Sequence, residues 1–359
     1  MKKIHLISKT HLDLGFTDLA EEVIKKYRND FIPLAVKLAD EMKETDTKFI
    51  WTAGSWLIND SLENASEENK AKLENAIKNG CISWHAMPFT THTELLDGDT
   101  LEYGLSIAKK LDIKFNKKTV AAKMTDVPGH TISLVPYLAK AGIKLLHIGV
   151  NEASRLPDVP EAFLWRHESG AEIAVIYDKS YGGIYKNEFI DDILCFLHSE
   201  DNKGPSSKEY IENKVKQLKA DYPDYEIAFS TLNDYAEAIW TVKDKLPVLT
   251  EEIGDTWIHG AASDPKKTAD LNELKRLKTK WLDEGKLIKD TAEYEKFCDA
   301  LIRVCEHTWG LDIKRHLGDF DNYLKKDFYK ARKKDKVKIP PFCGGELKKD
   351  FRRLIKEGV

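Results

Sequence analysis

Short apolar runs alternate with longer stretches of helical periodicity through the first two thirds of the chain. In a parallel sheet covered on both faces, strands read as continuous apolar runs of four to eight residues. By this criterion the sequence predicts seven strands, at residues 4–8, 48–53, 82–86, 119–124, 145–150, 171–178 and 225–230.

Amphipathic segments separate these runs. In residues 20–38 the apolar side chains recur every three or four positions, the period of one buried helix face. Ser206 and Glu209 have the spacing of a capping box at the start of another helix. Further helices are predicted at residues 67–79, 100–111, 132–141, 207–220 and 232–244. Strands alternating with helices predict βαβ units, and hence an α/β sheet or barrel.

The pattern changes near residue 265. Asp264 can cap a helix, and Pro265 suits the first helical position that follows. Beyond it the sequence is charged and mostly helical in period, and the basic run 325–338 is interpreted as a solvated helix face. We therefore expect an α/β domain over residues 1–265 and a helical region over residues 266–359.

Composition narrows the class of protein. The 359 residues are 42% hydrophobic and carry a formal net charge of −4, so neither nucleic acid nor an anionic membrane is expected as a partner. The five cysteines are widely spaced with no CxxC pair, which argues against disulfides and against a thiolate zinc site. No apolar run approaches the roughly 18 residues of a membrane span. We expect a cytoplasmic protein, and the sequence leaves a homo-oligomer open.

Polar and aromatic side chains follow several predicted strands. Because functional groups collect at the carboxyl ends of parallel strands, these residues are candidate site residues. His11 and Asp13 come after the first strand, and in an extended segment such i and i+2 side chains face the same space. The other candidates after strands are Trp84, His92, Glu94, Asp126, Glu200 and Asp201, and after the last strand come His259 and His307.

Each of these residues also has an ordinary structural interpretation. Asp126 precedes Val-Pro-Gly-His, a sequence that can simply close a turn. Trp84 can pack in the core, and His259 and His307 can be hydrogen-bonded histidines without a catalytic role. What favours a functional site is that all of these features occur in one order along the chain.

That order resembles glycoside hydrolase family 38, the metal-dependent α-mannosidases. The resemblance rests on "THLDLGFTD" with His11 and Asp13, and on "TDVPGHT" with Asp126. By position, His307 in "EHTWGLD" is the best match to the second histidine of the family's metal site. The chain is more similar still to an uncharacterised sister group of that family, which shares "PFTTHTELLD" and "EIGDTWIHGAASDP".

The resemblance implies a seven-stranded (β/α) barrel followed by a helical region that completes a metal site. The implied ligands are His11, Asp13, Asp126 and His307. Two carboxylates and two imidazoles suit zinc or another divalent metal, and the metal can grip the hydroxyls of a sugar. The implied substrate is therefore a mannoside-like carbohydrate.

The resemblance also implies the roles of a retaining glycoside hydrolase. Asp126 is the expected nucleophile. The general acid is expected in the loop at residues 199–205, where Asp201 is preferred and Glu200 is the alternative. Substrate contacts are expected from Trp84, His92, Glu94 and His259.

Two departures from the family pattern keep other functions open. Leu12 replaces the usual tryptophan between the histidine and the aspartate, and "EHTWGLD" replaces the family's HHD-type element. One alternative is a carbohydrate deacetylase, although the HxxxH-like pair typical of those enzymes is missing. The other is a catalytically inactive, carbohydrate-binding relative.

Overall fold

The computed structural model describes residues 2–45, 48–254, 257, 265–308, 310, 312, 315, 321–322 and 324–333. The chain divides into two compact units. Unit 1 comprises residues 1–12 and 25–258, and unit 2 comprises residues 13–24 and 259–359. The chain therefore passes from unit 1 to unit 2 between Leu12 and Asp13 and returns at Lys25.

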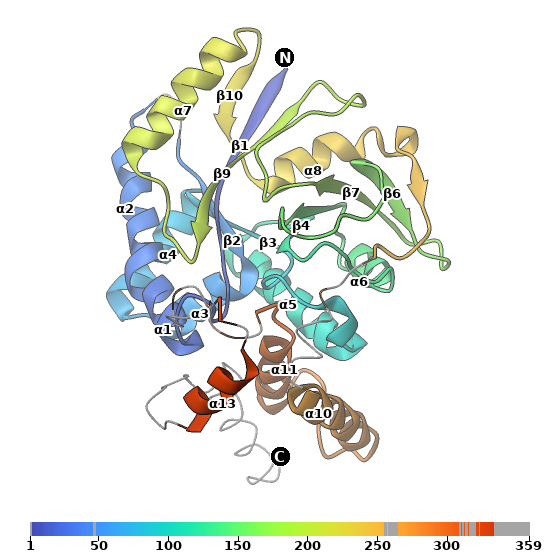
Figure 1. Cartoon of the computed structure of the whole chain (residues 1–359). Coiled ribbons are helices and arrows are strands. Elements are labelled where there is room, and N and C mark those ends of the chain that lie inside the picture. The colour runs from blue at the N-terminus through green and yellow to red at the C-terminus, as the bar shows by residue number, and fades with distance from the viewer. Residues whose placement is uncertain are drawn as a thin grey trace. The chain divides into compact units, whose positions relative to one another are not determined.

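The first sheet of unit 1 is built around the N-terminal strand β1 (Figure 1). Strands β2, β9 and β10 all pair with β1 in parallel, and the short β8 is antiparallel to β9. The order is β3-β2-β1-β9-β8, with β10 also paired to β1. The bounds are β1 Lys3–His11, β2 Trp51–Gly54, β3 Ile82–His85, β8 Ile184–Tyr185, β9 Ile193–Asp201 and β10 Glu226–Phe229.

The second sheet of unit 1 has the order β11-β6-β7-β5-β4. The pairs β4–β5, β5–β7 and β6–β11 are parallel, whereas β6 and β7 form an antiparallel pair. The bounds are β4 Ala121–Asp126, β5 Leu145–Val150, β6 Ala162–Arg166, β7 Glu172–Asp178 and β11 Val248–Leu249.

The predicted closed seven-stranded barrel is not what the described strands form. The α/β class and the parallel strands are confirmed, but the strands make two sheets, of six and five strands. Closing the barrel would require β3 to pair with β4. Among the described residues these two edge strands form no ladder, although the Ala86 N–H, just after β3, donates to the Ala121 carbonyl of β4 at 2.9 Å. The antiparallel strands β6 and β8 also break a simple repeat of βα units.

Helices connect the strands of unit 1, and their ends follow capping chemistry. The Ser66, Asp97 and Ser207 side chains accept from backbone N–H groups three residues further on. The cap of the helix predicted from Ser206 is therefore its neighbour Ser207. The helices are α1 Ala20–Lys26, which spans the unit boundary, α2 Ile32–Met42, α3 Ser55–Asn64, α4 Glu67–Lys78, α5 Gly98–Phe115, α6 Leu134–Lys140, α7 Lys208–Asp221 and α8 Leu232–Trp240.

Three shorter helical segments complete unit 1. Between α1 and α2 the chain forms a π-helix at Tyr27–Phe31, so that the predicted helix over 20–38 is interrupted by a wider turn. The two 3₁₀ segments, Thr93–Leu95 and Lys243–Lys245, lie in loops that follow strands and helices.

A large apolar core of unit 1 lies between the two sheets and helix α8. Ile7 of β1, Phe196 of β9 and Ile176 of β7 are in this cluster, together with Tyr235 and Ile239 of α8. Burying side chains of this size removes apolar surface from water and is the main source of stability. The core therefore fixes the strand ends that carry the candidate site.

The Asn233 side chain of α8 completes the hydrogen bonds at the start of β4. Its Oδ1 accepts from the N–H groups of Val120 and Ala121 at 2.8 and 3.0 Å. Asn233→Ala leaves these donors without their acceptor, so we expect a loss of about 2 kcal/mol in the free energy of unfolding. Urea unfolding measures this loss, with the exposed Asn213→Ala as control; equal stability of the two variants would contradict the assignment.

Unit 2 contains helices α10 Pro265–Asp283, α11 Ala292–Val304 and α13 Lys325–Lys333. Thr291 caps α11, and Trp281 and Phe297 pack edge to face between α10 and α11. The N-terminal segment 13–24 belongs to this unit because the Phe16 N–H donates to the Gly310 carbonyl at 3.1 Å. Among the described residues no helix is long and apolar enough to cross a membrane.

Candidate active site and metal centre

The carboxyl ends of β1 and β4 bring His11 and Asp126 together in unit 1. The His11 Nε2 lies 3.9 Å from an Asp126 carboxylate oxygen, and both side chains are buried. His11 also stacks on the Tyr181 ring, with the ring centroids 5.8 Å apart. Two residues separated by 115 positions in the chain thus form one polar pair at the strand ends.

The Asp126 carboxylate is held by two donors from neighbouring loops. Asn151, directly after β5, donates from Nδ2 to the Asp126 Oδ1 at 3.0 Å. The Tyr181 hydroxyl donates to the same oxygen and accepts a second bond from Asn151 at 2.9 Å. These bonds fix the carboxylate's orientation, as a nucleophile or metal ligand requires.

The backbone of Asp126 adopts a conformation that L-residues rarely take. Its φ is +91°, where a side chain is strained. Such outliers cost of order 1–3 kcal/mol and persist where the surroundings over-determine them, which is common at active sites. The strain at Asp126 is therefore a second, independent pointer to a functional role.

Unit 2 contains the other pair of predicted ligands, Asp13 and His307. The His307 Nε2 lies 3.1 Å from an Asp13 carboxylate oxygen, and the Thr308 hydroxyl donates to the same oxygen at 3.4 Å. On its other side, the His307 Nδ1 lies 2.7 Å from the carboxylate of Glu306. Asp13, Glu306 and His307 are each no more than 3% exposed.

The Glu306 carboxylate lies beside the second ring nitrogen of His307, at 2.7 Å from Nδ1, while Nε2 faces Asp13. A carboxylate near a ligating imidazole makes its other nitrogen a better ligand for a cation. The pair in unit 1, His11 and Asp126, and the pair in unit 2, Asp13 and His307, each offer one imidazole and one carboxylate, and these donor types fit a divalent cation.

The two candidate acids differ in their surroundings. Glu200 is exposed and forms an ion pair with Lys203. Asp201 ends β9 and pairs in register with His11 on β1. Both residues lie in a strand that the sequence-based prediction treated as a loop.

Asp201 is also electrostatically coupled to the interior of unit 1. The pKa of Lys9 is lowered well below its ordinary value, first because Lys9 is buried and then because Lys123 is close. Asp201 and Asp126 act in the opposite direction on the pKa of Lys9. Asp201 therefore lies close enough to the buried Lys9 amine to interact with its charge.

The remaining predicted site residues in the described part of the chain are Trp84, His92 and Glu94. Trp84 is 2% exposed, and its indole N–H donates to Asp112 of α5 at 3.0 Å, so this ring packs against a helix. His92 is buried just before the 3₁₀ segment Thr93–Leu95, in which Glu94 is exposed. His259 lies outside the described residues.

His130, which follows Asp126 in "TDVPGHT", is a buried neutral histidine. Its Nδ1 lies 3.4 Å from the Thr93 hydroxyl, and burial lowers its pKa to about 3, with a smaller contribution from His92. Its depressed pKa means that between pH 6.5 and 3 the unfolded chain binds the extra proton. Stability contributed by this group is present above pH 6.5 and is lost as the pH falls toward 3.

We therefore expect the protonation of His130 in the unfolded chain to lower the free energy of unfolding by about 1.4 kcal/mol for each pH unit below 6.5. Urea unfolding at pH 7 and pH 5 measures the slope. His130→Gln should show a shallower slope than the wild type, whereas the half-buried His167→Gln should keep the wild-type slope. Identical slopes in all three proteins would contradict the prediction.

Three residues around the candidate ligands were not assigned roles from the sequence. Glu306 directly precedes His307, and the adjacency of an acid and a histidine was the signal that could have indicated it. Asn151 follows a predicted strand, so its position at a strand end was visible. Tyr181 lies in a loop after β7, and nothing in the local sequence distinguishes it from other tyrosines.

In α/β enzymes the functional groups lie at the carboxyl ends of parallel strands, where His11 and Asp126 are found here. Residues 1–231 match the model of the glycosyl hydrolases family 38 N-terminal domain, and residues 261–356 match a domain of unknown function (DUF5054). The chain belongs to glycosyl hydrolases family 38, which confirms the family predicted from the sequence. Curated protein sequences give no match.

Solved structures show the same fold at low sequence identity. An α-mannosidase from Enterococcus faecalis V583 aligns with the whole chain at 13% identity and a TM-score of 0.67. A second family 38 glycosyl hydrolase from Enterococcus faecalis aligns at 11% identity and a TM-score of 0.57, again over the whole chain. The chain spans 43% and 40% of the length of these two proteins.

Proposed function

We propose that this chain is the catalytic part of a metal-dependent retaining glycoside hydrolase that acts on α-mannosides. The observation that carries the proposal is the fixed carboxylate of Asp126, which receives hydrogen bonds from Asn151 and Tyr181 and lies beside His11. This residue is also within the matched family segment. The printed description of one structural relative, an α-mannosidase, supports the choice of substrate.

In this proposal His11, Asp13, Asp126 and His307 bind one cation. Each unit supplies one histidine and one carboxylate. Since His11 and Asp13 are two residues apart, an extended chain separates them by about 7 Å at most, so one cation can reach both pairs. The bound metal, zinc or another divalent ion, would hold sugar hydroxyls and stabilise nearby negative charge.

The chain's own residues perform the proton and bond chemistry. The Asp126 carboxylate attacks the anomeric carbon, and Asn151 and Tyr181 keep it aligned during the attack. Asp201 protonates the departing glycosidic oxygen. In the second half, Asp201 takes a proton from water, which then displaces Asp126 and releases the sugar with its original anomeric configuration.

A panel of aryl glycosides tests the proposal. The metal-loaded chain should release the aryl alcohol from α-mannosides faster than from α-glucosides or α-galactosides, and chelation should remove the activity. Acetate release from acetylated sugars, without glycoside cleavage, would instead support a deacetylase. Sugar binding without turnover of any substrate would support an inactive carbohydrate-binding relative.

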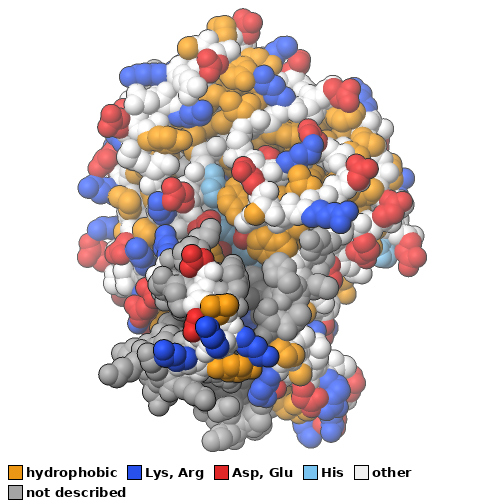
Figure 2. All heavy atoms as spheres, viewed as in Figure 1, with side chains coloured by type: hydrophobic (Ala, Val, Ile, Leu, Met, Phe, Trp, Pro, Cys, Tyr) orange, Lys and Arg blue, Asp and Glu red, His pale blue; other side chains and the backbone are white. Residues whose placement is uncertain are grey.

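The surface charge gives no competing indication of a polyanionic ligand on the face drawn in Figure 2. There, lysine and arginine side chains are interspersed with aspartate and glutamate over unit 1. A nucleic-acid site would need basic side chains grouped on one face. A carbohydrate substrate, which is proposed here, needs no such grouping.

A further inference from the structure

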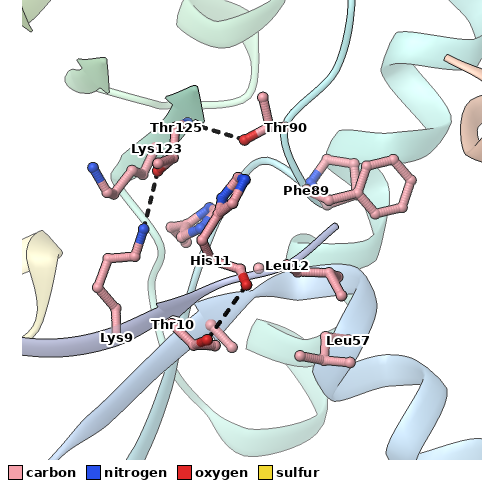
Figure 3. A pocket seen from close by; sticks show the side chains of 13 residues that line it. Lys9, Thr10, His11, Leu12, Leu57, Phe89, Thr90, Lys123 and Thr125 are labelled. Carbon is pink, nitrogen blue, oxygen red and sulfur yellow. Dashed lines mark hydrogen bonds between the residues drawn. The ribbon is translucent and has the colours of Figure 1, made fainter. Parts of the chain in front are cut away.

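The end of β1 is held by the hydroxyl of a buried tyrosine. Tyr27 is fully buried, and its hydroxyl donates to the His11 carbonyl at 3.0 Å. The same hydroxyl lies 3.2 Å from the Thr10 hydroxyl. In Figure 3, Thr10 and His11 lie together at the end of β1, beside a small cavity. The backbone that carries His11 is therefore fixed by a side chain from another element.

Tyr27 is the first residue of the π-helix Tyr27–Phe31 between α1 and α2. Such turns are rare, and they frequently lie at functional sites. The Tyr27 ring packs edge to face on Phe31, with the ring centroids 5.1 Å apart. Next to it, the Arg28 Nη2 donates to both carboxylate oxygens of Asp60 in α3, at 2.9 and 2.8 Å. These contacts fix the π-helix, and with it the position of the Tyr27 hydroxyl.

The residues at the end of β1 also hold the turn that contains Asp201. The Thr10 hydroxyl donates to the Lys203 carbonyl at 2.6 Å, and the Asn202 N–H donates to the His11 carbonyl at 2.9 Å. Asn202 has a φ of +50°, a left-handed conformation that asparagine adopts more readily than most residues. The His11 carbonyl therefore accepts from the π-helix on one side and from the Asp201 turn on the other.

The pairing between β1 and β9 shifts at the same point. Thr10 pairs with Ser199, whereas His11 pairs with Asp201, so Glu200 is an extra residue on β9. Such β-bulges re-aim side chains and are over-represented next to active sites. Without the bulge, His11 would pair with Glu200. The bulge thus places Asp201 opposite His11.

We propose that Tyr27 is a positioning residue of the candidate site. Its hydroxyl fixes the end of β1, and thereby holds His11 and, through Thr10, the turn that contains Asp201. The inference rests on the proposed function, in which His11 binds the cation and Asp201 is the acid. Removing a group that orients a metal ligand typically costs about 10- to 100-fold in metal affinity.

Tyr27→Phe removes the hydroxyl and keeps the buried ring. We expect the dissociation constant for zinc, measured by competition with a chromogenic chelator, to rise about ten-fold. Tyr185→Phe is the matched control, because the buried Tyr185 hydroxyl also donates to a backbone carbonyl, that of Glu161, at 3.1 Å. This control should bind zinc as tightly as the wild type does.

Urea unfolding of the same two variants separates positioning from stability. Each variant loses one hydrogen bond to a backbone carbonyl, so both should be destabilised to a similar extent. Only Tyr27→Phe should lose zinc affinity. Wild-type zinc affinity in Tyr27→Phe, or an equal loss of affinity in both variants, would overturn the proposal.

A pair of variants at Thr10 keeps the inference testable if Tyr27→Phe does not fold. Thr10→Val keeps the size of the side chain but lacks the hydroxyl that lies between Tyr27 and the Lys203 carbonyl. Thr10→Ser keeps that hydroxyl. Zinc affinity should fall in Thr10→Val and be restored in Thr10→Ser, and equal affinity of the two variants would overturn the proposal.

Zinc affinity is measured without hydrolysis, so the inference and the proposed function can fail separately. Weaker zinc binding by Tyr27→Phe in a protein that cleaves no glycoside would support the positioning role and contradict the proposed function. An active hydrolase whose variants all bind zinc equally would contradict the positioning role alone. A wild type that binds no zinc would overturn the positioning role together with the proposed metal dependence.

Discussion

Replacing Asp126 with Asn should lower kcat for an aryl α-mannoside by at least about 10³-fold. The amide keeps the size of the side chain but is not a nucleophile, so the glycosyl–enzyme bond cannot form. Asn151 and Tyr181 both donate to the Asp126 Oδ1, and an amide oxygen at that position still accepts these bonds. The variant should therefore fold and bind substrate while losing the chemical step.

The exposed Asp158→Asn is the matched control for Asp126→Asn, since it makes the same chemical change away from the site. Steady-state kinetics measure kcat of both variants, and circular dichroism shows whether each is folded. Wild-type kcat in the control and a folded but inactive Asp126→Asn are expected. If folded Asp126→Asn kept more than a tenth of the wild-type kcat, Asp126 would not be the nucleophile.

Asp13→Ala should reduce the bound metal from about one equivalent to almost none. Asp13 supplies one of only two carboxylates among the four candidate ligands, and its loss also removes the negative charge beside His307. Elemental analysis after equilibration with one equivalent of zinc and gel filtration measures the stoichiometry. Hydrolysis should disappear together with the metal.

Glu306→Gln should weaken metal binding less than Asp13→Ala does. The substitution removes the negative charge beside the His307 Nδ1, so metal affinity should fall by about 10- to 100-fold rather than vanish. The exposed Glu293→Gln at the start of α11 should keep full metal content. If Asp13→Ala bound as much metal as the wild type, Asp13 would not be a metal ligand. The proposed site with four ligands would then be wrong.

The strand and helix pattern was the most predictable part of the fold. The strand at Leu145–Val150 has the predicted bounds, and those at Glu172–Asp178 and Glu226–Phe229 differ by one residue. Local apolar runs carry this information because strands buried on both faces contain few polar residues. Strands β6, β8, β9 and β11 were not predicted. Of these, β9 has the clearest signal, because its apolar start "ILCFL" was assigned to a long loop.

Sheet closure could not be predicted in the same way. Whether β3 and β4 form a ladder depends on backbone pairing between segments far apart in the chain, and no local pattern encodes it. The division into units raises the same difficulty. Residues 13–24 belong with the C-terminal unit through contacts such as that of Phe16 with Gly310, almost 300 residues away.

The candidate ligands were visible in the sequence, whereas the groups that orient them were less so. His11 and Asp13 have the i, i+2 spacing of one strand face, and Asp126 follows an apolar run. Tyr181 reaches Asp126 from a loop 55 residues away, a contact that only the folded chain creates. Trp84 illustrates the opposite case, because a tryptophan after a strand can as readily pack on a helix such as α5.

The anomeric configuration of the first product tests the central claim most directly. Proton NMR during hydrolysis of an aryl α-mannoside by the metal-loaded chain distinguishes α-mannose from β-mannose before mutarotation mixes them. Retention through the Asp126 intermediate predicts that α-mannose appears first and that chelation stops its formation. Release of β-mannose first, or hydrolysis that persists without metal, would contradict the account.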